Sequence, residues 1–309
     1  MKKKIIYEIK ALYRDNFRIT GYEFGSGKKS VCVVGSIRGN EIQQLYTCSQ
    51  LVKRLKKLEE EGKLVKGHKI LVIPSINPYS MNIKKRFWST DNTDINRMFP
   101  GYNLGETTQR IAAGVFEVIK DYQYGMQFAS FYMPGNFTPH IRMMKAGYEN
   151  VELAKEFGMP YVVLRNTRPY DTTTLNYNWQ IWETNAFSIY TTTTAEVDKE
   201  SAGTAIRSIL NFLSKEGIVD YCGHEGYISR VVEDTDMVPV RTRVAGIFES
   251  EVKVGDEVLK GQLLARVIDP YEGEVSETLI APIDGIVFFQ HNDPLTYADT
   301  AVFKLMKGR

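Results

Sequence analysis

The sequence has few of the residues that usually bind metals or form disulfides. Its 309 residues include three cysteines and four histidines. The cysteines, Cys32, Cys48 and Cys222, are too few and too scattered for a disulfide framework or a cysteine zinc cage. Lys and Arg number 39 and Asp and Glu number 37, a net charge of +2. This small excess excludes a strong basic field that would hold nucleic acid or an anionic membrane.

Long apolar runs are also missing. The longest runs, such as 31–35 and 70–74, are far shorter than the roughly 18 residues that a membrane span needs. The basic start at 1–4 is followed by only three apolar residues before Glu8, so no signal-peptide core is expected. We therefore expect a cytoplasmic protein without a membrane partner. With 43% hydrophobic residues, the chain can bury a large core.

The first part of the chain, 1–223, alternates strand and helix patterns. Short apolar runs predict strands at 31–34, 69–74, 161–164 and 188–194. Apolar residues at helical spacing predict helices at 41–58, 107–122, 150–157 and 201–216, the last with Ser201 as its N-cap. Such alternation is typical of a mainly parallel sheet with helices on both faces.

The last part, 224–309, has short strand patterns and many turns, which predict a small all-β module, a sandwich or barrel. Similar stretches begin at Gly246 and Gly285, 39 residues apart, and suggest two similar halves. A biotin or lipoyl carrier needs a lysine at a tight hairpin between such halves, and we find none. A structural role is therefore expected for this module.

The segment 25–30 looks like a phosphate-binding loop. That motif needs a glycine separated by four residues from its Gly-Lys pair, and Ser or Thr after the pair, but Tyr22 and Lys29 occupy these places. The segment also precedes a predicted strand instead of following one. We expect a hairpin turn here.

Polar segments gather where strands are expected to end. Gly39-Asn40-Glu41 follows the first strand and leads into a helix, the usual place of a site in an open α/β sheet. The turn-rich stretch 91–101 contains Asp94-Ile95-Asn96-Arg97-Met98-Phe99-Pro100-Gly101, and Pro139-His140-Ile141-Arg142 and Thr194-Ala195-Glu196 follow later.

Together these motifs resemble the succinylglutamate desuccinylase/aspartoacylase family, part of the zinc carboxypeptidase-like superfamily. The resemblance covers nearly the whole chain and implies a three-layer α/β domain with a mainly parallel sheet, followed by the small β module. It also implies a hydrolase of amide bonds in N-acyl amino acids. In that family a His-x-x-Glu pair and a distant histidine hold one zinc ion, a glutamate acts as general base, and arginines bind the substrate carboxylate.

Carried over by position, the resemblance places Glu41 as a zinc ligand, Glu196 as the general base, and Asn96 with Arg97 as the substrate-binding pair. The other two ligand positions hold Arg38 and Ser130. Arginine has no lone pair to offer and repels a cation, and a serine hydroxyl is a poor zinc ligand at neutral pH. The resemblance thus implies a zinc site with two of its three ligands replaced.

Several alternatives remain open for the site residues. His140 could lie near the site, but a ligand set of His140, Glu41 and Glu196 would remove the base, and a structural loop histidine is the other interpretation. Arg97 could instead pair with Asp91 or Asp94 to fix its loop. The segment 165–187, with Arg165, Arg168, Trp179 and Trp182, could cover a pocket mouth or simply pack in the core.

Two functions follow from this pattern. The first is a zinc-dependent amide hydrolase, and the alternative is a binding or regulatory protein that keeps the pocket for a small carboxylate-bearing ligand. We hypothesise that Arg38 lies at or beside the zinc position and neutralises Glu41, and also Glu196, because two carboxylates left without a metal repel each other. We expect Arg38, Glu41 and Glu196 to converge at the carboxyl ends of the strands. The sequence does not indicate an oligomeric state.

Overall fold

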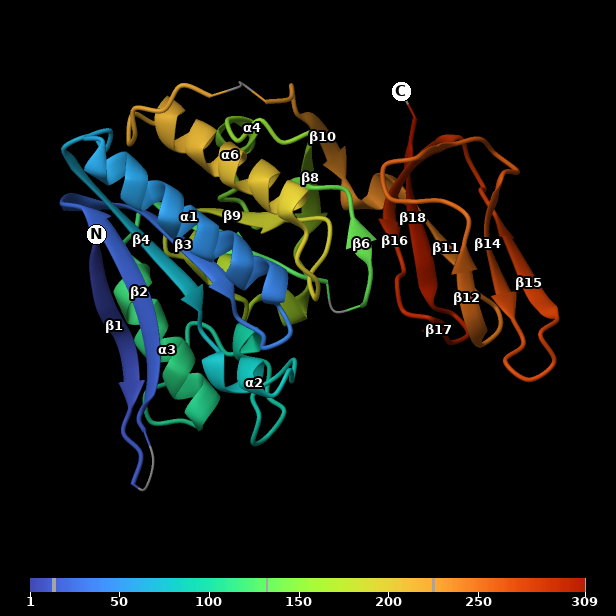
Figure 1. Cartoon of the computed structure of the whole chain (residues 1–309), viewed down its shortest axis with the longest axis horizontal. Helices are drawn as coiled ribbons and strands as arrows, with labels where there is room; N and C mark the ends of the chain where they lie inside the picture. Colours follow the sequence, from blue (N-terminus) through green and yellow to red (C-terminus); the bar gives the residue numbers. More distant parts are fainter. Residues whose placement is uncertain (13–14, 132, 224–225, 309) are drawn as a thin grey trace. The chain divides into compact units, whose positions relative to one another are not determined.

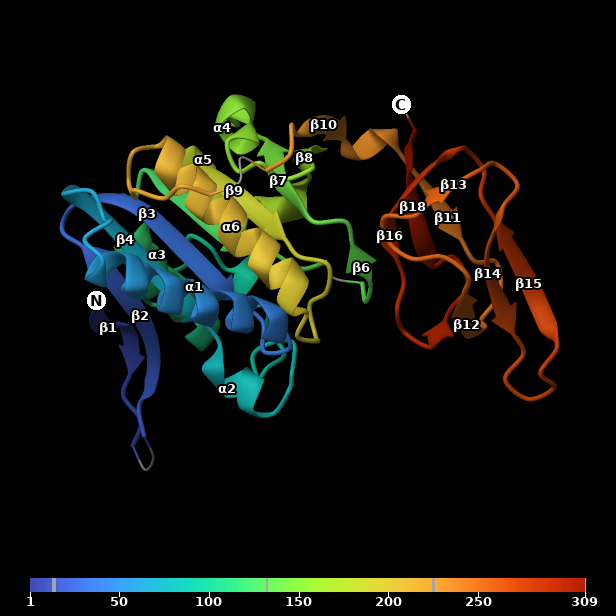
Figure 2. The same ribbon diagram turned by 45° about the horizontal axis from the view of Figure 1, so that its top comes forward.

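The computed structural model describes residues 1–12, 15–131, 133–223 and 226–308. The chain divides into two compact units. Unit 1 comprises Met1–Ser130 and Pro139–Val231, and unit 2 comprises Phe131–Thr138 and Val232–Arg309. Figures 1 and 2 show the layered α/β arrangement of unit 1 and the strand-rich unit 2.

A nine-stranded sheet forms the centre of unit 1, with the order β1-β2-β4-β3-β5-β9-β7-β8-β10. Its strands are β1 (Lys2–Ile9), β2 (Phe17–Gly25), β3 (Gly27–Ser36), β4 (Gly67–Ser75), β5 (Tyr124–Phe128), β7 (His140–Lys145), β8 (Tyr161–Asn166), β9 (Asn185–Tyr190) and β10 (Arg230–Glu233). The pairs β3–β4, β3–β5, β5–β9 and β7–β8 are parallel, whereas β1–β2, β2–β4 and β7–β9 are antiparallel. The expected mainly parallel sheet is confirmed for the strands at its centre.

Helices cover both faces of this sheet. They are α1 (Ile42–Glu60), α2 (Pro78–Asn82), α3 (Thr107–Ile119), α4 (Val151–Lys155), α5 (Leu175–Ile181) and α6 (Lys199–Lys215), with short 3-10 helices η1 (Ile95–Arg97) and η2 (Pro169–Asp171). One buried core joins α1, α4 and α6 to one face, and a second core joins α3 and α5 to the other. Figure 1 shows α1 and α6 side by side on the first of these faces. The three layers implied by the resemblance are therefore present.

The helix predictions hold with one correction at a helix end. On α1, the apolar residues at helical spacing that predict the helix are buried at Cys48, Leu55 and Leu58 and half-buried at Ile42, Leu45 and Val52. The N-cap of α6 is Asp198, not Ser201: its carboxylate accepts hydrogen bonds from the backbone N–H of Glu200 and Ser201. A carboxylate at a helix N-terminus also gains from the helix dipole. The Ser201 hydroxyl instead accepts a hydrogen bond from Thr192 N.

Two strand predictions also need correction. The strand expected at 188–194 ends at Tyr190, and Thr191 to Thr194 belong to the following loop. The segment 25–30 is not the turn of a hairpin, because β4 lies between β2 and β3 in the sheet. Gly27 has φ +122°, and a Cβ there would lie 2.3 Å from Gly67 O, so the close approach of β4 requires glycine.

Unit 2 contains two antiparallel sheets. One has the order β11-β18-β16-β13, with β6 also paired to β16, and the other has the order β15-β14-β12-β17. The strands are β6 (Asn136–Phe137), β11 (Met237–Arg241), β12 (Gly246–Ser250), β13 (Glu257–Val258), β14 (Leu263–Ile268), β15 (Val275–Ile280), β16 (Gly285–Gln290), β17 (Leu295–Thr296) and β18 (Ala301–Lys307), with the 3-10 helix η3 (Asp234–Asp236). The two similar stretches of the sequence each begin a strand, β12 at Gly246 and β16 at Gly285, one in each sheet. The all-β character predicted for the end of the chain is confirmed, but the unit begins at Val232 and also includes Phe131–Thr138, whereas the sequence predicted a module of 224–309.

None of the helices in the described ranges is both long and apolar enough to cross a membrane.

Candidate functional site

The candidate site lies where three neighbouring parallel strands end. The order β3-β5-β9 brings the loops that follow these strands to one edge of the sheet. The first loop carries Arg38 and Glu41, and the second carries Ser130. The third loop is held at the start of α1, because Gln43 N donates to Thr194 O at 3.0 Å and Asp198 N donates to Gln43 Oε1 at 2.9 Å.

Glu41 is buried, with 1% of its surface exposed, and both of its oxygens accept hydrogen bonds. Oε2 accepts from the backbone N–H of Ile37 at 2.9 Å and of Arg38 at 3.0 Å. Oε1 accepts from the Ser130 hydroxyl and from Arg38 Nη1, the latter at 3.2 Å. A buried carboxylate needs such partners, since an unpaired buried charge is strongly unfavourable. The chain itself therefore supplies the partners of Glu41.

Arg38 lies between two carboxylates. Its Nη1 contacts Glu41 Oε1 and Ser130 Oγ, the latter at 3.3 Å, while Nε and Nη2 donate to Asp94 Oδ2 at 3.2 and 2.7 Å. Burial by itself lowers the pKa of Arg38, but the negative charges of Glu41 and Asp94 outweigh this effect and raise the pKa above its usual range. The guanidinium is a fixed positive charge beside Glu41, as hypothesised. Its second carboxylate partner is Asp94, whereas Glu196 was expected.

The residues at this position do not fit a zinc ion. Catalytic zinc takes three N, O or S ligands and a water, but Arg38 offers no lone pair and the Ser130 hydroxyl donates its hydrogen to Glu41. Within the described part of the chain, no group of three or more His, Cys, Asp or Glu side chains is placed to hold a metal ion. The chemistry of these side chains, with a cation already beside Glu41, argues against zinc here.

Of the three histidines in the described part of the chain, His68 and His291 lie away from this position. His68, at the start of β4, contacts the Ser30 hydroxyl at 2.9 Å, and His291, in unit 2, packs edge-on against Phe248. His140 is buried at the first position of β7 and stacks on Tyr190, with ring centroids 4.5 Å apart. His140 therefore belongs to a strand and not to a loop, and its stacking partner Tyr190 lies close enough to Arg38 and Glu41 to be affected by their charges. His224 lies outside the described residues.

Glu196 reaches the expected edge of the sheet but not the expected partners. Its loop is tied to the first turn of α1 by the Gln43 contacts, close in sequence to Glu41. The side chain is exposed, and no hydrogen bond or ion pair joins it to Arg38 or Glu41. Convergence is therefore seen for Arg38 and Glu41 but not for Glu196.

Asn96 and Arg97 lie on η1, next to the segment after β8. Asn96 Oδ1 accepts from Leu175 N at 3.1 Å, so this side chain orders the start of α5. Arg97 Nη1 donates to Tyr170 O at 3.3 Å and lies 3.9 Å from Asp171 Oδ1. The expected alternative pairing with Asp91 or Asp94 is not found, because Asp94 binds Arg38 and Asp91 accepts from Thr93 N.

Three arginines surround Tyr170, an arrangement that the sequence did not predict. The guanidinium carbons of Arg97, Arg165 and Arg168 lie 5.7, 5.9 and 6.0 Å from its ring centroid. Arg165 and Arg168 also donate to the Tyr170 hydroxyl, at 3.2 and 2.8 Å. Asp171, 1% exposed, pairs with Arg165 at 3.1 Å. We call Arg97, Arg165 and Arg168 with Tyr170 the arginine cluster. Several guanidinium groups so close together favour an anion.

Two further arginines extend the positive charge towards Arg38. Burial lowers the pKa of Arg86, and repulsion by Arg38 lowers it further. Arg142 lies over the Tyr190 ring, 4.4 Å from its centroid. Burial raises the pKa of the Tyr190 phenol, whereas the charges of Arg142, Arg165 and Arg38 oppose this rise. These couplings indicate that the region between Arg38 and the arginine cluster is rich in positive charge.

The residues of the segment 165–187 have different surroundings in the structure. Trp179, on α5, is fully buried and donates from its indole N–H to Ile119 O at 3.1 Å, so it belongs to the core. Trp182, 45% exposed, packs edge-on against Phe116. Core packing thus accounts for Trp179, whereas Trp182 lies at the surface against the Phe116 ring, and Arg165 and Arg168 of this segment belong to the arginine cluster.

Comparisons with known proteins agree with this architecture. The chain is 23% identical, over 86% of its length and 76% of the relative, to an N-alpha-acetyl-L-2,4-diaminobutyric acid deacetylase of Halomonas elongata. A solved succinylglutamate desuccinylase/aspartoacylase from Rhodobacter sphaeroides matches 95% of this chain and 90% of its own, with a TM-score of 0.78 and 22% identity. A product-bound structure of the ectoine utilization protein EutE (DoeB) from Ruegeria pomeroyi matches the same shares, with a TM-score of 0.78 and 19% identity.

The family comparison is more specific than these likenesses. The model of the succinylglutamate desuccinylase/aspartoacylase catalytic domain matches residues 27–214, a range that contains Arg38, Glu41, Asp94, Ser130 and the arginine cluster. The match covers more than half of the chain. The chain therefore belongs to the succinylglutamate desuccinylase/aspartoacylase family.

Proposed function

We propose that this protein binds a small carboxylate-bearing ligand at the ends of β3, β5 and β9, and that Arg38 takes the place of zinc beside Glu41. The observation that carries the proposal is the position of the Arg38 guanidinium, which contacts Glu41, Asp94 and Ser130 at once. A permanent cation at this point removes the need for a divalent ion to balance Glu41. It also removes the means by which zinc would activate water.

The arginine cluster would receive the ligand carboxylate. Arg97 is the most accessible of its ion-paired members, with 35% of its side chain exposed against 16% for Arg165. Its guanidinium makes a single backbone hydrogen bond at 3.3 Å and a long contact with Asp171, so donors remain for a forked contact with a carboxylate. Asn96 would act indirectly, by holding η1 against the start of α5.

N-acyl amino acids are the class of ligand to test. The relative from Halomonas elongata is named for a substrate of this class, and the family name refers to two more. We expect saturable binding of an N-acetyl or N-succinyl amino acid by protein treated with a chelator. Isothermal titration with and without added zinc would measure it, together with release of the free acid. Affinity that appears only after zinc is added would contradict the proposal.

The second candidate is a zinc-dependent amide hydrolase, and the family match favours it. Glu41 would then bind the metal and Glu196 would be the base. This function requires Arg38 to leave Glu41 and Asp94, since its guanidinium now lies beside the ligand oxygen. Release of acid that increases with the zinc content of the purified protein would establish it in place of the first.

A further inference from the structure

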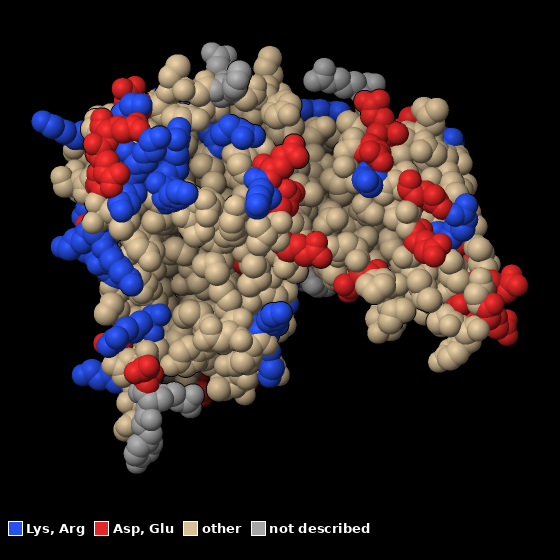
Figure 3. Space-filling model, viewed as in Figure 1, with Lys and Arg blue, Asp and Glu red and all other residues tan. Residues whose placement is uncertain are grey.

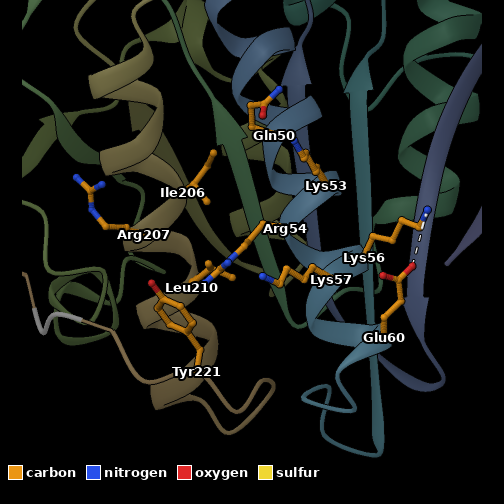
Figure 4. Close-up of a pocket in the computed structure, with 10 residues that line it drawn as sticks. All are labelled: Gln50, Lys53, Arg54, Lys56, Lys57, Glu60, Ile206, Arg207, Leu210 and Tyr221. Atoms are coloured by element: carbon orange, nitrogen blue, oxygen red, sulfur yellow. Dashed lines mark ion pairs between the residues drawn. The ribbon is translucent and has the colours of Figure 1, made fainter.

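Unit 1 has a groove on the outer side of α1 and α6, away from the ends of β3, β5 and β9. Its volume is about 690 Å³. Ile206 and Leu210 of α6 and Tyr221 form its apolar part, while α1 contributes Gln50 and a row of cationic side chains. In Figure 4, Arg54 and Lys57 extend from α1 across the groove towards Leu210 and Tyr221. We call this the α1–α6 groove.

Positive charge in this groove is poorly balanced. Arg54 lies over the Tyr221 ring, 5.8 Å from its centroid, and Arg207 donates to the Thr204 hydroxyl. Neither of them, nor Lys53, forms an ion pair with a carboxylate of the described residues. Lys56 and Glu60 also line the groove and pair with each other at 3.8 Å, and Lys57 pairs with Glu61 at 3.7 Å, so the unpaired cations are Lys53, Arg54 and Arg207. An apolar floor beneath unbalanced cations suits a partner with an apolar side chain flanked by carboxylates.

The two units carry charges of opposite sign. Residues 232–309 contain eight Lys and Arg against fourteen Asp and Glu, a net charge of −6, and the segment 131–138 is uncharged. The rest of the chain therefore carries +8, because the whole chain carries +2. Figure 3 shows Lys and Arg gathered over α1 of unit 1, and mostly Asp and Glu among the charged side chains on the visible face of unit 2. Such a distribution favours attraction between the unlike units of two molecules.

The turn between β14 and β15 has the complementary chemistry. Asp269 holds this turn, because its Oδ1 accepts from the backbone N–H of Tyr271 at 2.8 Å and of Glu272 at 2.9 Å. The Tyr271 side chain is 95% exposed at the tip, and Glu272 and Glu274 beside it are exposed as well. A turn whose backbone is already held by Asp269, and which presents an aromatic residue followed by two carboxylates, loses less entropy on binding than a free segment.

We infer that the hairpin tip 269–274 of one molecule docks in the α1–α6 groove of a second copy of this chain. Tyr271 enters beside Ile206, Leu210 and Tyr221. Glu272 and Glu274 approach Arg54, Lys57 and Lys53. One hairpin tip in one groove is smaller than a standard protein interface of about 800 Å² per partner. The association is therefore weak, depends on protein concentration, and weakens as salt screens the charges.

A charge exchange between two variants tests this inference. Arg54→Glu with Lys57→Glu reverses the groove, and Glu272→Lys with Glu274→Lys reverses the tip. Each variant alone repels its own copies and sediments as a monomer. In an equal mixture, the negative groove of the first variant meets the positive tip of the second, and the unchanged groove and tip also match. Sedimentation equilibrium should show association only in the wild type and in the mixture.

Tyr271→Ala tests the apolar part of the contact. A central aromatic anchor carries about 2 kcal/mol of binding, so self-association should weaken about 30-fold. The matched controls are Tyr297→Ala, an exposed tyrosine of unit 2, and Lys10→Glu with Lys66→Glu, which changes the net charge equally outside the groove. Both controls should associate as the wild type does. A wild type that stays monomeric to about 1 mM, or a mixture that stays monomeric, would overturn the inference.

Discussion

Arg38 and Asp94 lie 56 residues apart in the chain and meet through two hydrogen bonds to one carboxylate oxygen, of 3.2 and 2.7 Å. The same guanidinium contacts Glu41 at 3.2 Å. The Arg38 side chain is 7% exposed and Glu41 is 1% exposed, while Asp94 is half-buried, so one positive and two negative groups form a network that is largely shielded from water. Removing one member of such a network leaves another buried charge without a partner.

Replacing Arg38 with Met should therefore destabilise the protein strongly. Glu41 would keep its backbone and Ser130 hydrogen bonds but lose its only cationic partner among the described residues. Breaking a buried ion pair typically costs about 3–5 kcal/mol. Urea unfolding followed by circular dichroism would measure this loss.

The control for this variant is Arg110→Met, which removes an exposed arginine on α3 and should change the unfolding free energy by less than about 0.5 kcal/mol. Equal stability of the Arg38 variant and the wild type would show that the guanidinium does not neutralise Glu41 in solution.

Arg38→His combined with Ser130→His should create a zinc site. Both positions already adjoin Glu41 Oε1, and two imidazoles with one carboxylate make a common catalytic zinc set. We expect about one zinc ion per molecule after dialysis, measured by mass spectrometry of the metal content, against a much smaller amount in the wild type.

The matched control is Arg38→Ala with Ser130→Ala, which empties the same space without adding ligands and should bind no zinc. Stoichiometric zinc in the dialysed wild type would contradict the replacement of zinc by Arg38 and would favour the zinc-dependent hydrolase.

The sequence predicted the parts of the site that depend on local order along the chain. Glu41 stands directly before α1 and Ser130 follows β5, so the parallel order of the strands brings them together. Asp94 as the partner of Arg38 was not predicted, because a salt bridge between two loops depends on how those loops fold and not on the spacing of residues. The arginine cluster was missed for the same reason. Arg97 lies on η1, after β4, and Arg165 lies in β8, and only the folded chain brings both against the Tyr170 ring.

The antiparallel pair β7–β9 could not be read from the sequence either. Both strands are six residues long and mix polar with apolar residues, and the pattern of a buried strand is the same whichever way its neighbour runs. Similarly, the turn at 25–30 looks like a hairpin because the chain does reverse there. The strands β2 and β3 do not pair with each other, because β4, which comes later in the chain, lies between them.

His68 should make stability depend on pH in the weakly acidic range. Burial lowers the pKa of His68 in the folded protein, and the charge of Lys28 adds to this effect. In the unfolded chain the imidazole takes up a proton near pH 6.5. The depressed folded pKa thus contributes stability above about pH 6.5 that is lost as the pH falls.

Urea unfolding of the wild type and of His68→Gln, at about pH 7.5 and about pH 5.5, would measure this effect. The wild type should lose more stability than the variant on acidification, and because His140 and His291 are present in both proteins, the difference isolates His68. The same loss in both would exclude His68 as its source.

Arg97→Ala should weaken ligand binding and leave the fold intact. Arg97 is partly exposed, and Asp171 keeps its 3.1 Å contact with Arg165 when Arg97 is removed, so the melting temperature should change little. Loss of a forked, charge-assisted contact should lower affinity by about 1.5–3 kcal/mol, roughly 10- to 150-fold. Isothermal titration with the N-acyl amino acid that binds the wild type best would measure it, with Arg110→Ala as the control that should bind normally. Because the two effects are measured separately, a fall in melting temperature with unchanged affinity would assign Arg97 to the support of Tyr170 and Asp171 instead.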